Sequence, residues 1–475
     1  MTATNTLPRI IQGGMGVAVS NWQLARAVAQ EGHLGVVSGT ALDTVLVRRL
    51  QDGDPGGDVR RAMARFPLPD VSTYVLGRFF RPDGRAPGEP YRLLPMYRQH
   101  VSTLRQQITM LAAFVEVSLA REGHDGVVGI NLLTKIQMPT LPTLYGAMLA
   151  GVQVVLMGAG IPRDIPGALD ALALHQPASI AFTVVGAASG NSDRLTFDPQ
   201  QHLPGAAAPL EHPQFLPIVS AASLAQTLAR KSNGRVDGFV VEAPSAGGHN
   251  APPRGALRLD ERGEPIYGDR DVVDLAVMRE IGLPFWLAGG TGSPEALDAA
   301  LAEGAAGIQV GTLFAFSDES GFAPDIKRRV VNAARQQALQ VRTDVRASPT
   351  GYPFKIIDLA DDDVTAAASA ARTRVCDLGA LREAVRRPDG SLVYRCPAEP
   401  VAQYVAKGGA LEDTVDRQCL CNALSAAIGQ PQPREHGTLE PAIVTSGDDI
   451  VHLGKFLAGR EHYAAREVLH YLTRG

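Results

Sequence analysis

Short apolar runs alternate along the chain with longer segments whose apolar residues recur at helical spacing. The runs are rich in β-branched residues and are bounded by glycines, prolines or polar residues, a pattern that is typical of parallel α/β proteins. Eight runs are predicted to be strands: Arg9–Gln12, Leu34–Ser38, Val127–Leu132, Val152–Met157, Leu216–Ser220, Gly238–Glu242, Pro284–Ala288 and Gly307–Val310.

Amphipathic segments follow most of these runs, for example Trp22–Glu31, Ala222–Lys231 and Pro294–Glu303. The last of these begins with Ser293 and Pro294, which are favourable as the N-cap and the first residue of a helix. Eight strand–helix units in the first part of the chain predict an α/β fold of the TIM (β/α)8 barrel type with insertions.

The alternation of predicted strands and helices is interrupted in three places. Residues 52–126 are polar and rich in proline and glycine at first and then helical from Tyr97 to Arg121, so we interpret them as an insertion. Residues 179–197 are predicted to form an additional hairpin with the turn GAASGNSD. After about residue 345 the parallel-strand pattern stops. We therefore predict a barrel over residues 1–345 and a mostly helical extension over 346–475.

Composition excludes some classes of partner. The 45 Lys and Arg against 49 Asp and Glu give a net charge of −4, which does not indicate a basic face for nucleic acid. The beginning, MTATNTLPRIIQ, lacks the basic and apolar parts of a signal peptide. The longest apolar run, over residues 147–160, is too short and glycine-rich to span a bilayer. We expect a cytoplasmic protein without a nucleic-acid or membrane partner.

In a TIM barrel the active site forms at the carboxyl ends of the strands. Here those ends carry many glycines and a few polar side chains. They are Gly13, Gly14, Met15 and Gly16 at the first strand, Asn131 at the third, Glu242, Gly247, Gly248 and His249 at the sixth, Gly289, Gly290 and Gly292 at the seventh, and Gln309, Gly311 and Thr312 at the eighth. These residues are the candidates for a binding and catalytic site.

The loops after the seventh and eighth strands are the usual phosphate site of this fold. Backbone N–H groups of Gly289–Gly290 and Gly311–Thr312 could hold a phosphate, although glycines also serve simply to make tight turns. The first loop, GGMGVAV, does not match the G-x-G-x-x-G of a dinucleotide-binding fold, and Ser38 stands where an acidic residue would contact a ribose. A flavin mononucleotide (FMN) fits better.

His249 follows two glycines at a strand end, a place where proton chemistry is often found. The alternative is a turn histidine that neighbouring groups satisfy. The motifs IIQGGMG, GINL, AGGH, LAGGTG and QVGT then occur, in this order, over about residues 8–317. This series resembles nitronate monooxygenases, whose wider superfamily includes flavin-dependent enoyl-acyl-carrier-protein reductases.

The resemblance implies an FMN-binding barrel in which Asn131 and Gln309 contact the flavin. It also implies that Gly247 and Gly248 approach the flavin closely, that Gly289, Gly290, Gly311 and Thr312 hold its phosphate, and that His249 is the catalytic base. Glu242-Ala243 stands where the family usually has Gln-Gly, and Ser245 stands in place of a Glu. The role of Glu242 therefore stays open.

The leading functional hypothesis is a monooxygenase that oxidises nitroalkanes or nitronates with O₂, with His249 as general base. A second class comes from the motifs RVCDLGALR, YRCPAEPV and CLCNAL, which resemble stand-alone enoyl reductases of polyketide and polyunsaturated fatty acid synthesis. It implies NAD(P)H and an acyl-carrier protein as partners, with Arg60, Arg61, Arg78 and Arg81 as a possible basic surface. A third hypothesis is a non-catalytic flavin- or metal-binding partner.

All four cysteines, Cys376, Cys396, Cys419 and Cys421, lie in the last part of the chain. Their spacing, C-x19-C-x22-C-x-C, is not that of a standard zinc site, which joins two close pairs. Convergence on zinc or on an iron–sulfur cluster remains a hypothesis because the clustering needs a cause. The alternative is buried, reduced thiols that act as small apolar side chains.

Overall fold

A computed structural model describes residues 7–187, 193–205, 208–359 and 372–474. Eight parallel strands form its centre in the order β1-β11-β10-β9-β8-β4-β3-β2. A further parallel bridge between Ile11 and Leu34 joins the two ends of this series and closes it into a barrel. The strands are β1 (Ile10–Gln12), β2 (Gly35–Ser38), β3 (Val128–Leu133), β4 (Val154–Gly158), β8 (Gln214–Val219), β9 (Phe239–Glu242), β10 (Phe285–Ala288) and β11 (Gly307–Val310). The predicted barrel and its eight strands are confirmed.

The interior of the barrel is a packed core. One cluster of buried side chains comes from alternate positions of the strands and includes Ile11, Val36, Leu156 and Val240. Trp286 joins this cluster, is 1% exposed, and donates from its indole N–H to the carbonyl of Pro8 at 3.0 Å. Because successive side chains of a strand point to opposite faces, the remaining strand residues pack outward against the helices.

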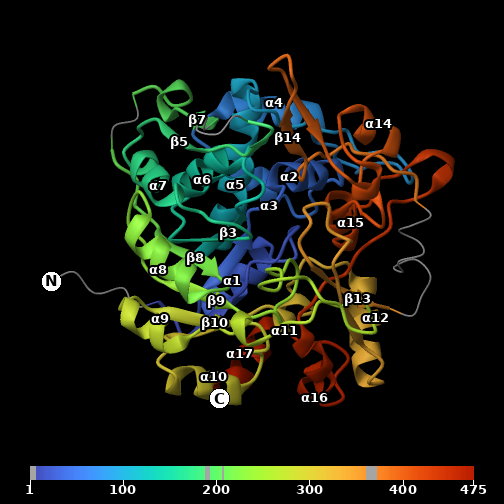
Figure 1. The fold of residues 1–475 in the computed structure, drawn as a ribbon. Helices are drawn as coiled ribbons and strands as arrows, with labels where there is room; N and C mark the ends of the chain where they lie inside the picture. Colours follow the sequence, from blue (N-terminus) through green and yellow to red (C-terminus); the bar gives the residue numbers. More distant parts are fainter. Residues whose placement is uncertain (1–6, 188–192, 206–207, 360–371, 475) are drawn as a thin grey trace.

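Helices surround the barrel (Figure 1). They include α1 (Trp22–Gln30), α6 (Thr140–Leu149), α7 (Ile165–Ala173), α8 (Ala222–Lys231), α9 (Leu275–Ile281), α10 (Pro294–Ala302), α11 (Thr312–Ala315) and α12 (Pro324–Arg335). The predicted cap of α10 is present, since the Ser293 hydroxyl accepts from the N–H of Ala296 at 3.1 Å. Helix α17 (Ala465–Thr473), from the far end of the described chain, packs against both α1 and α10.

The two expected insertions contain the expected kinds of element. Residues 52–126 contribute α3 (Asp58–Met63), α4 (Pro69–Phe79) and α5 (Thr103–Ala120), which pack with α2 (Leu42–Gln51). In the second insertion, β5 (Ala178–Ala181) pairs antiparallel with β7 (Arg194–Phe197). Part of the predicted turn, residues 188–192, lies outside the described residues. The short strand β6 (Val184–Val185) pairs with β14 (Glu383–Arg386) and so links this insertion to the region after residue 346.

The region after residue 346 contains the expected helices and also strands that the sequence analysis did not predict. The helices are α14 (Val401–Ala406), α15 (Leu420–Ala427), α16 (Leu453–Leu457) and α17. The strand β13 (Phe354–Asp358) pairs with β12 (Gln340–Asp344), and β15 (Leu392–Arg395) pairs with β14. Short 3-10 helices lie at Pro199–Gln201, Asp269–Asp271, Leu411–Thr414, Glu435–Gly437 and Asp448–His452. These strands are short and pair locally, so they lack the regular spacing that marks the barrel strands.

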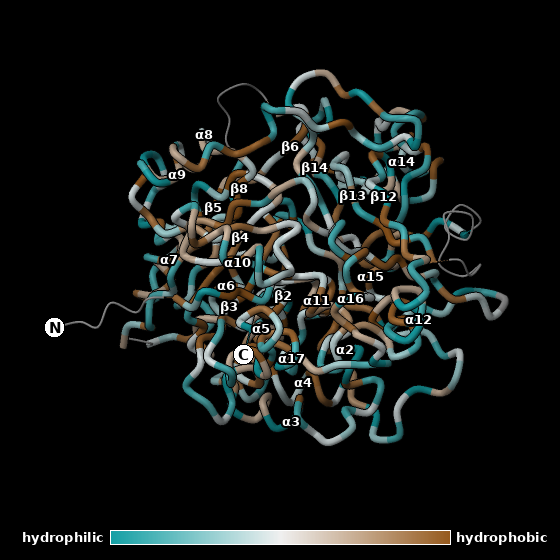
Figure 2. Tube along the Cα trace, turned by 90° about the horizontal axis from the view of Figure 1, so that it is seen from below, coloured by the Kyte–Doolittle hydropathy of each residue, from teal (hydrophilic) through white to brown (hydrophobic). Residues whose placement is uncertain are grey.

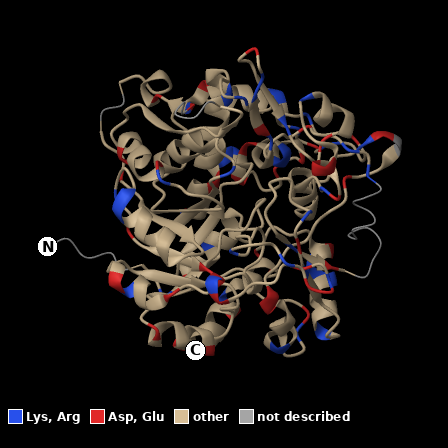
Figure 3. Cartoon of the chain, in the orientation of Figure 1, with Lys and Arg blue, Asp and Glu red and all other residues tan. Residues whose placement is uncertain are grey.

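Hydrophobic residues gather along the interior elements, and hydrophilic ones dominate the outer loops (Figure 2). Basic and acidic residues are interspersed around the molecule in the view of Figure 3. None of the helices in the described ranges is long and apolar enough to cross a membrane.

Candidate active site

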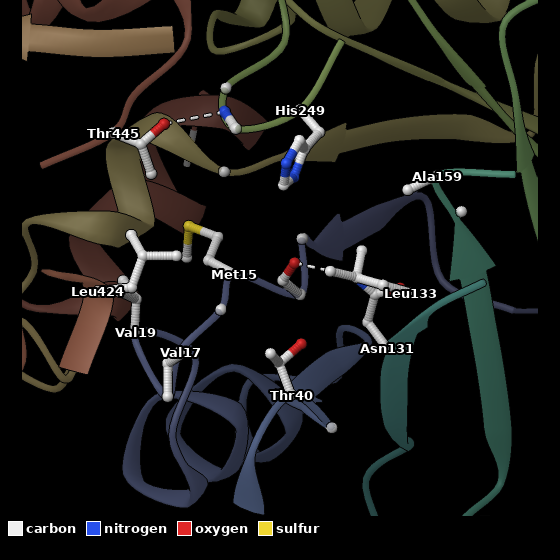
Figure 4. Close-up of a pocket in the computed structure, with 18 of the residues that line it drawn as sticks. Met15, Val17, Val19, Thr40, Asn131, Leu133, Ala159, His249, Leu424 and Thr445 are labelled. Atoms are coloured by element: carbon white, nitrogen blue, oxygen red, sulfur yellow. Dashed lines mark hydrogen bonds between the residues drawn. The ribbon is translucent and has the colours of Figure 1, made fainter. Parts of the chain in front are cut away.

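A cavity of about 250 Å³ lies at the carboxyl ends of the barrel strands. Figure 4 shows side chains from several loops pointing into it, His249 and Asn131 among them. All thirteen residues predicted for cofactor binding and catalysis line this one cavity: Gly13, Gly14, Met15, Asn131, Glu242, Gly247, Gly248, His249, Gly289, Gly290, Gln309, Gly311 and Thr312. The structure therefore brings the predicted set together, and the role of each residue remains a proposal.

Two side-chain amides face the cavity with unmet hydrogen-bonding capacity. Asn131, on β3, donates from Nδ2 to the carbonyl of Gly14 at 2.9 Å. Its Oδ1 and the Oε1 of Gln309, on β11, are both sealed from solvent and have no partner among the described residues. Buried polar atoms are nearly always paired in native proteins. These two amides therefore fit the polar edge of a bound planar ligand such as a flavin.

The glycines of this site allow close contact between loops. A Cβ on Gly14 would lie 2.2 Å from the Cβ of Asn131, and one on Gly247 would lie 2.7 Å from the carbonyl carbon of Ser446. Gly289 and Gly290 have φ values of +91° and +70°, a region that other residues rarely adopt. Tight packing thus explains several of these glycines without any ligand. Gly311 is different, because its φ is negative and a Cβ there would make only an ordinary contact, with the Met15 sulfur at 3.6 Å.

Backbone donors suited to an anion are available at the predicted phosphate loops. Among the described residues, no hydrogen bond uses the N–H of Gly290, Gly311 or Thr312. Unengaged backbone N–H groups on neighbouring loops are donors of the kind that bind phosphate oxygens. The residues present therefore fit the phosphate group of FMN.

Four residues that the sequence analysis missed also line the cavity: Thr445, Ser446, Gly447 and Asp449. The hydroxyl of Thr445 accepts from the N–H of Gly248 at 2.9 Å. The hydroxyl of Thr312 donates to Asp449 at 2.5 Å and accepts from the N–H of Gly447 at 3.2 Å. Thr312 therefore keeps only its N–H free for a ligand. The run TSGDD is small and polar, but it lies outside the barrel loops, which were the only segments inspected.

His249 is held by residues from the segment between β12 and β13. Its Nε2 lies 2.7 Å from the Ser348 hydroxyl, and its ring packs edge-on against Phe354 with centroids 4.8 Å apart. Burial lowers the pKa of His249 to about 3, and the positive charge of Lys135 lowers it further in the same direction. The imidazole is therefore neutral at pH 7, and within the described ranges the one hydrogen bond of its ring is that of Nε2, which leaves Nδ1 without a bond to the protein.

Glu242 ends strand β9 and lines the cavity where the resembling family has an amide. Burial raises the pKa of Glu242 to about 7. A protonated carboxyl group has one donor and one acceptor, as the edge of an amide does. Near neutral pH this glutamate can therefore present nearly the same hydrogen bonds as a glutamine.

The four cysteines, Cys376, Cys396, Cys419 and Cys421, line one small void in the region after residue 346. Within the described ranges, no group of three or more His, Cys, Asp or Glu side chains is arranged to hold a metal ion. The hypothesis of a zinc or iron–sulfur site at these residues is therefore not supported. Burial raises the pKa of Cys376 to about 11 and raises those of the other three thiols as well, which favours protonated, apolar packing.

We expect the four thiols to react slowly with a thiol reagent in the native protein and rapidly after unfolding. The reason is that the thiolate is the reactive form and burial disfavours it. Thiol titration with Ellman's reagent, with and without guanidinium, measures this difference. Stoichiometric zinc or iron in elemental analysis of untagged protein, with thiols that stay protected until a chelator is added, would contradict the packing explanation.

The protein belongs to the structural class of eight-stranded parallel α/β barrels, and its glycine-lined cavity lies at the carboxyl ends of the strands. Residues 203–390 match the sequence model of the family described as nitronate monooxygenase. A curated relative, described as a probable nitronate monooxygenase from Staphylococcus saprophyticus, is 32% identical over 142 residues. The resemblance drawn from the sequence motifs is thus confirmed over the segment that contains His249 and the loops after β9, β10 and β11.

The match with the curated relative covers only part of both proteins. The alignment with the curated relative spans 30% of this chain and 37% of the relative's length.

Among solved structures, FabK from Thermotoga maritima has a TM-score of 0.48 and 15% identity, covering 99% of this chain and 93% of that one. Nitroalkane oxidase from Streptomyces ansochromogenes has the same score and identity, covering 98% and 95%. The enoyl reductase domain of MlnA from Bacillus amyloliquefaciens has a TM-score of 0.49 and 11% identity, covering 98% and 95%. Likenesses at this level do not bear on the site.

Proposed function

We propose that this protein is an FMN-dependent oxidoreductase that oxidises nitroalkanes or nitronates with O₂. The observation that carries the proposal is one cavity that holds a neutral histidine, two side-chain amides whose oxygens have no partner among the described residues, and free backbone donors. The family match over residues 203–390 includes the histidine and both phosphate loops and supports the same reaction class.

The residues divide into three groups by the part of FMN that each would hold. The N–H groups of Gly290, Gly311 and Thr312 would bind the phosphate. The amides of Asn131 and Gln309 would bind the polar edge of the flavin, and Glu242 would add a third contact in its protonated form. When bound, FMN supplies the acceptor for two electrons from the substrate and passes them on to O₂.

The chain's own contribution is the removal of a proton from the carbon beside the nitro group. Because Nε2 of His249 is bonded to Ser348, Nδ1 is the atom left to face a substrate in the cavity. A neutral imidazole can accept that proton, and general-base help of this kind is worth about 10²–10⁴-fold in rate. The mostly apolar walls, such as Leu133, Ile136 and Leu424, exclude water from the reacting carbon.

Enoyl reduction with NAD(P)H remains a second candidate because of one observation. The motifs that resemble stand-alone enoyl reductases contribute directly to the cavity wall. The contributing residues are Leu378, Gly379, Ala380 and Leu381 from the first motif and Leu420, Cys421 and Leu424 from the third. An acyl-carrier protein would need a basic surface, yet Arg60, Arg61 and Arg81 are each paired with a carboxylate. This pairing weakens the basic surface expected from the sequence.

One comparison of two assays separates the candidates. Holoenzyme is incubated with nitroethane while O₂ uptake is followed, and with NADPH and a crotonyl thioester while NADPH consumption is followed. The proposed function predicts O₂ uptake with nitroethane and no enoyl-dependent loss of NADPH. The reverse pattern would assign the enzyme to enoyl reduction, and inactivity in both would remove the proposal.

Asp449 gives a prediction about cofactor affinity. Burial raises the pKa of Asp449, whose carboxyl group is bonded to Thr312 at the phosphate loops. Above its raised pKa the carboxylate would repel the phosphate, so FMN affinity should fall as pH rises. A like charge within about 10 Å at an effective dielectric constant of about 20 costs about 1.7 kcal/mol, which corresponds to about 20-fold in affinity.

Asp449→Asn should therefore bind FMN about 20-fold more tightly than wild type wherever Asp449 is ionised, and the difference should shrink as the pH falls toward its raised pKa. Quenching of FMN fluorescence on titration into apo-protein measures the dissociation constant from pH 5 to pH 9. Parallel pH curves for the two proteins would show that Asp449 does not face the phosphate.

A further inference from the structure

A continuous chain of hydrogen bonds runs from His249 to a lysine. The Nε2 of His249 lies 2.7 Å from the Ser348 hydroxyl, and that hydroxyl lies 2.8 Å from the hydroxyl of Thr350. Lys135 Nζ lies 3.2 Å from the Thr350 hydroxyl. Each link joins a group that can donate a proton to one that can accept it.

The fold holds this chain in place from three elements. His249 follows β9 and Lys135 follows β3, while Ser348 and Thr350 lie in the turn between β12 and β13. Backbone hydrogen bonds from Asn250 to Pro353 and from Lys355 to Gly248, at 2.9 and 3.0 Å, fasten that turn to the histidine loop. Ser348 is fully buried, so its hydroxyl cannot exchange its partners for bulk water.

We propose that Lys135 is the terminal proton acceptor for His249, reached through the hydroxyl groups of Ser348 and Thr350. This inference rests on the proposed function, in which His249 removes a proton from the substrate. Lys135 does not line the cavity, so it acts through other groups and is a positioning residue for the proton rather than a catalytic one.

The proton balance is simple. The substrate carbon loses a proton to Nδ1 of His249, and Nε2 gives its proton to the oxygen of Ser348. The Ser348 hydroxyl proton moves to the oxygen of Thr350, and the Thr350 hydroxyl proton moves to the neutral amine of Lys135. The histidine returns to a neutral state, and the lysine becomes an ammonium ion that can lose its proton to solvent because it is only half-buried.

Two features of the site make such an exit necessary and possible. The buried His249 holds a proton poorly, so a proton taken from the substrate must move on. Burial lowers the pKa of Lys135 to about 7, so near neutral pH its amine is available as an acceptor.

Other charged or titratable groups lie close to the chain. Tyr352 packs its ring under Nζ of Lys135, Arg417 donates to the carbonyl of Ser348 at 2.6 Å, and Glu242 lines the same cavity as His249. Burial raises the pKa of Glu242 to about 7, the value to which burial lowers the pKa of Lys135. A pH experiment therefore needs a variant of Glu242 beside the variants of the chain.

The test measures anaerobic flavin reduction by freshly dissolved neutral nitroethane in a stopped-flow instrument. Thr350→Val keeps the shape of the side chain and removes the central hydroxyl, and Ser348→Ala interrupts the chain one step earlier. Each should lower the rate by about 10-fold to 100-fold, a part of the full general-base effect of about 10²–10⁴-fold. Reduction by preformed nitronate should change little, because that substrate has already lost its proton.

The wild-type rate should rise with pH through about 7, as Lys135 becomes neutral and able to accept. This inflection should persist in Glu242→Gln and disappear in Lys135→Ala. Added ethylamine should restore the rate of Lys135→Ala, because a small amine can replace the missing acceptor. Lys135→Arg should stay slow, because arginine keeps the charge but does not release a proton in proteins. Lys231→Ala, at an exposed lysine, is the matched control and should resemble wild type.

A readout without FMN checks the geometry. In apo-protein labelled with ¹⁵N at histidine, Ser348→Ala should change the Nε2 resonance of His249 and leave its Nδ1 resonance nearly unchanged. Unaltered resonances would show that the Ser348 contact is absent and would overturn the chain.

The outcomes separate this inference from the proposed function. If His249→Ala is inactive on nitroethane while Thr350→Val and Lys135→Ala keep wild-type rates and pH profiles, the relay is wrong and the base assignment stands. A wild-type rate in Lys135→Arg would show that only the positive charge at this position matters, and it would also overturn the relay. If His249→Ala itself retains full activity, the proposed function fails, whatever the relay variants do.

Discussion

Replacing His249 with alanine should abolish flavin reduction by a neutral nitroalkane while sparing most of the activity on the preformed nitronate. Only the neutral substrate still needs its proton removed, and general-base catalysis contributes about 10²–10⁴-fold. The structure places the neutral imidazole at the cavity with one nitrogen free for this task. Stopped-flow reduction with each substrate, at equal FMN content, measures the two rates.

Two controls make the result interpretable. FMN content of His249→Ala should match wild type, since the glycine loops and the two amides are untouched. His462→Ala, at an exposed histidine paired with Asp318, should behave as wild type. Equal loss on both substrates would mean that His249 does something other than remove a proton. Unchanged rates on both would favour the non-catalytic hypothesis.

Gly311→Val should leave a folded protein that contains almost no FMN. Gly311 has φ −109° and ψ −58°, which other residues can adopt, so the substitution carries no left-handed strain. The nearest atom to a new Cβ is the Met15 sulfur at 3.6 Å, an ordinary contact. The valine would therefore fit the empty cavity and occupy the space that a bound phosphate needs. Flavin absorbance per protein, set against wild type at about one equivalent, measures the loss.

The matched control is Gly77→Val, in helix α4, where a Cβ would meet open space. It should keep its FMN. Thermal unfolding of apo-proteins should give similar midpoints for wild type and Gly311→Val. A yellow Gly311→Val protein with normal affinity would place the phosphate elsewhere. A colourless wild-type protein, expressed with adequate riboflavin, would remove the cofactor assignment altogether.

The barrel and the predicted site residues could be read from the sequence because their signals are local. A β-branched run predicts a buried strand, and a glycine or polar residue at its end predicts a loop on the active face. For that reason Gly13, Asn131, His249 and Gln309 were found before their distances were known. Their convergence follows from the closed order of the strands.

The residues that complete the site could not be predicted in the same way. Ser348, Thr350 and the run from Thr445 to Asp449 come from outside the eight predicted units, and their contacts with the cavity span about 100 or more positions. The spacing of apolar residues in a sequence does not indicate a contact between residues that are so far apart in the chain. Lys135 was overlooked because it lies three positions after the motif GINL and reaches the histidine only through two hydroxyl groups.

The sequence analysis left open whether the four cysteines converge on a metal or pack as separate buried thiols. The structure places all four at one void, without an arrangement of ligands for a metal among the described residues. The spacing carried no information on whether their sulfur atoms point toward a common centre. Side-chain direction depends on backbone geometry in β14–β15 and α15, which a sequence pattern does not specify.

Helix α17 rests on α1 and α10, and Arg474 just after it pairs with Asp298 of α10 at 2.8 Å. Its buried residues Val468, Leu469 and Leu472 belong to the same core as the barrel strands. During synthesis on the ribosome, the strand β11 emerges long before the helix that covers this side of the ring. The apolar surface that α17 covers on α1 and α10 therefore stays exposed to solvent until residues 465–473 leave the exit tunnel.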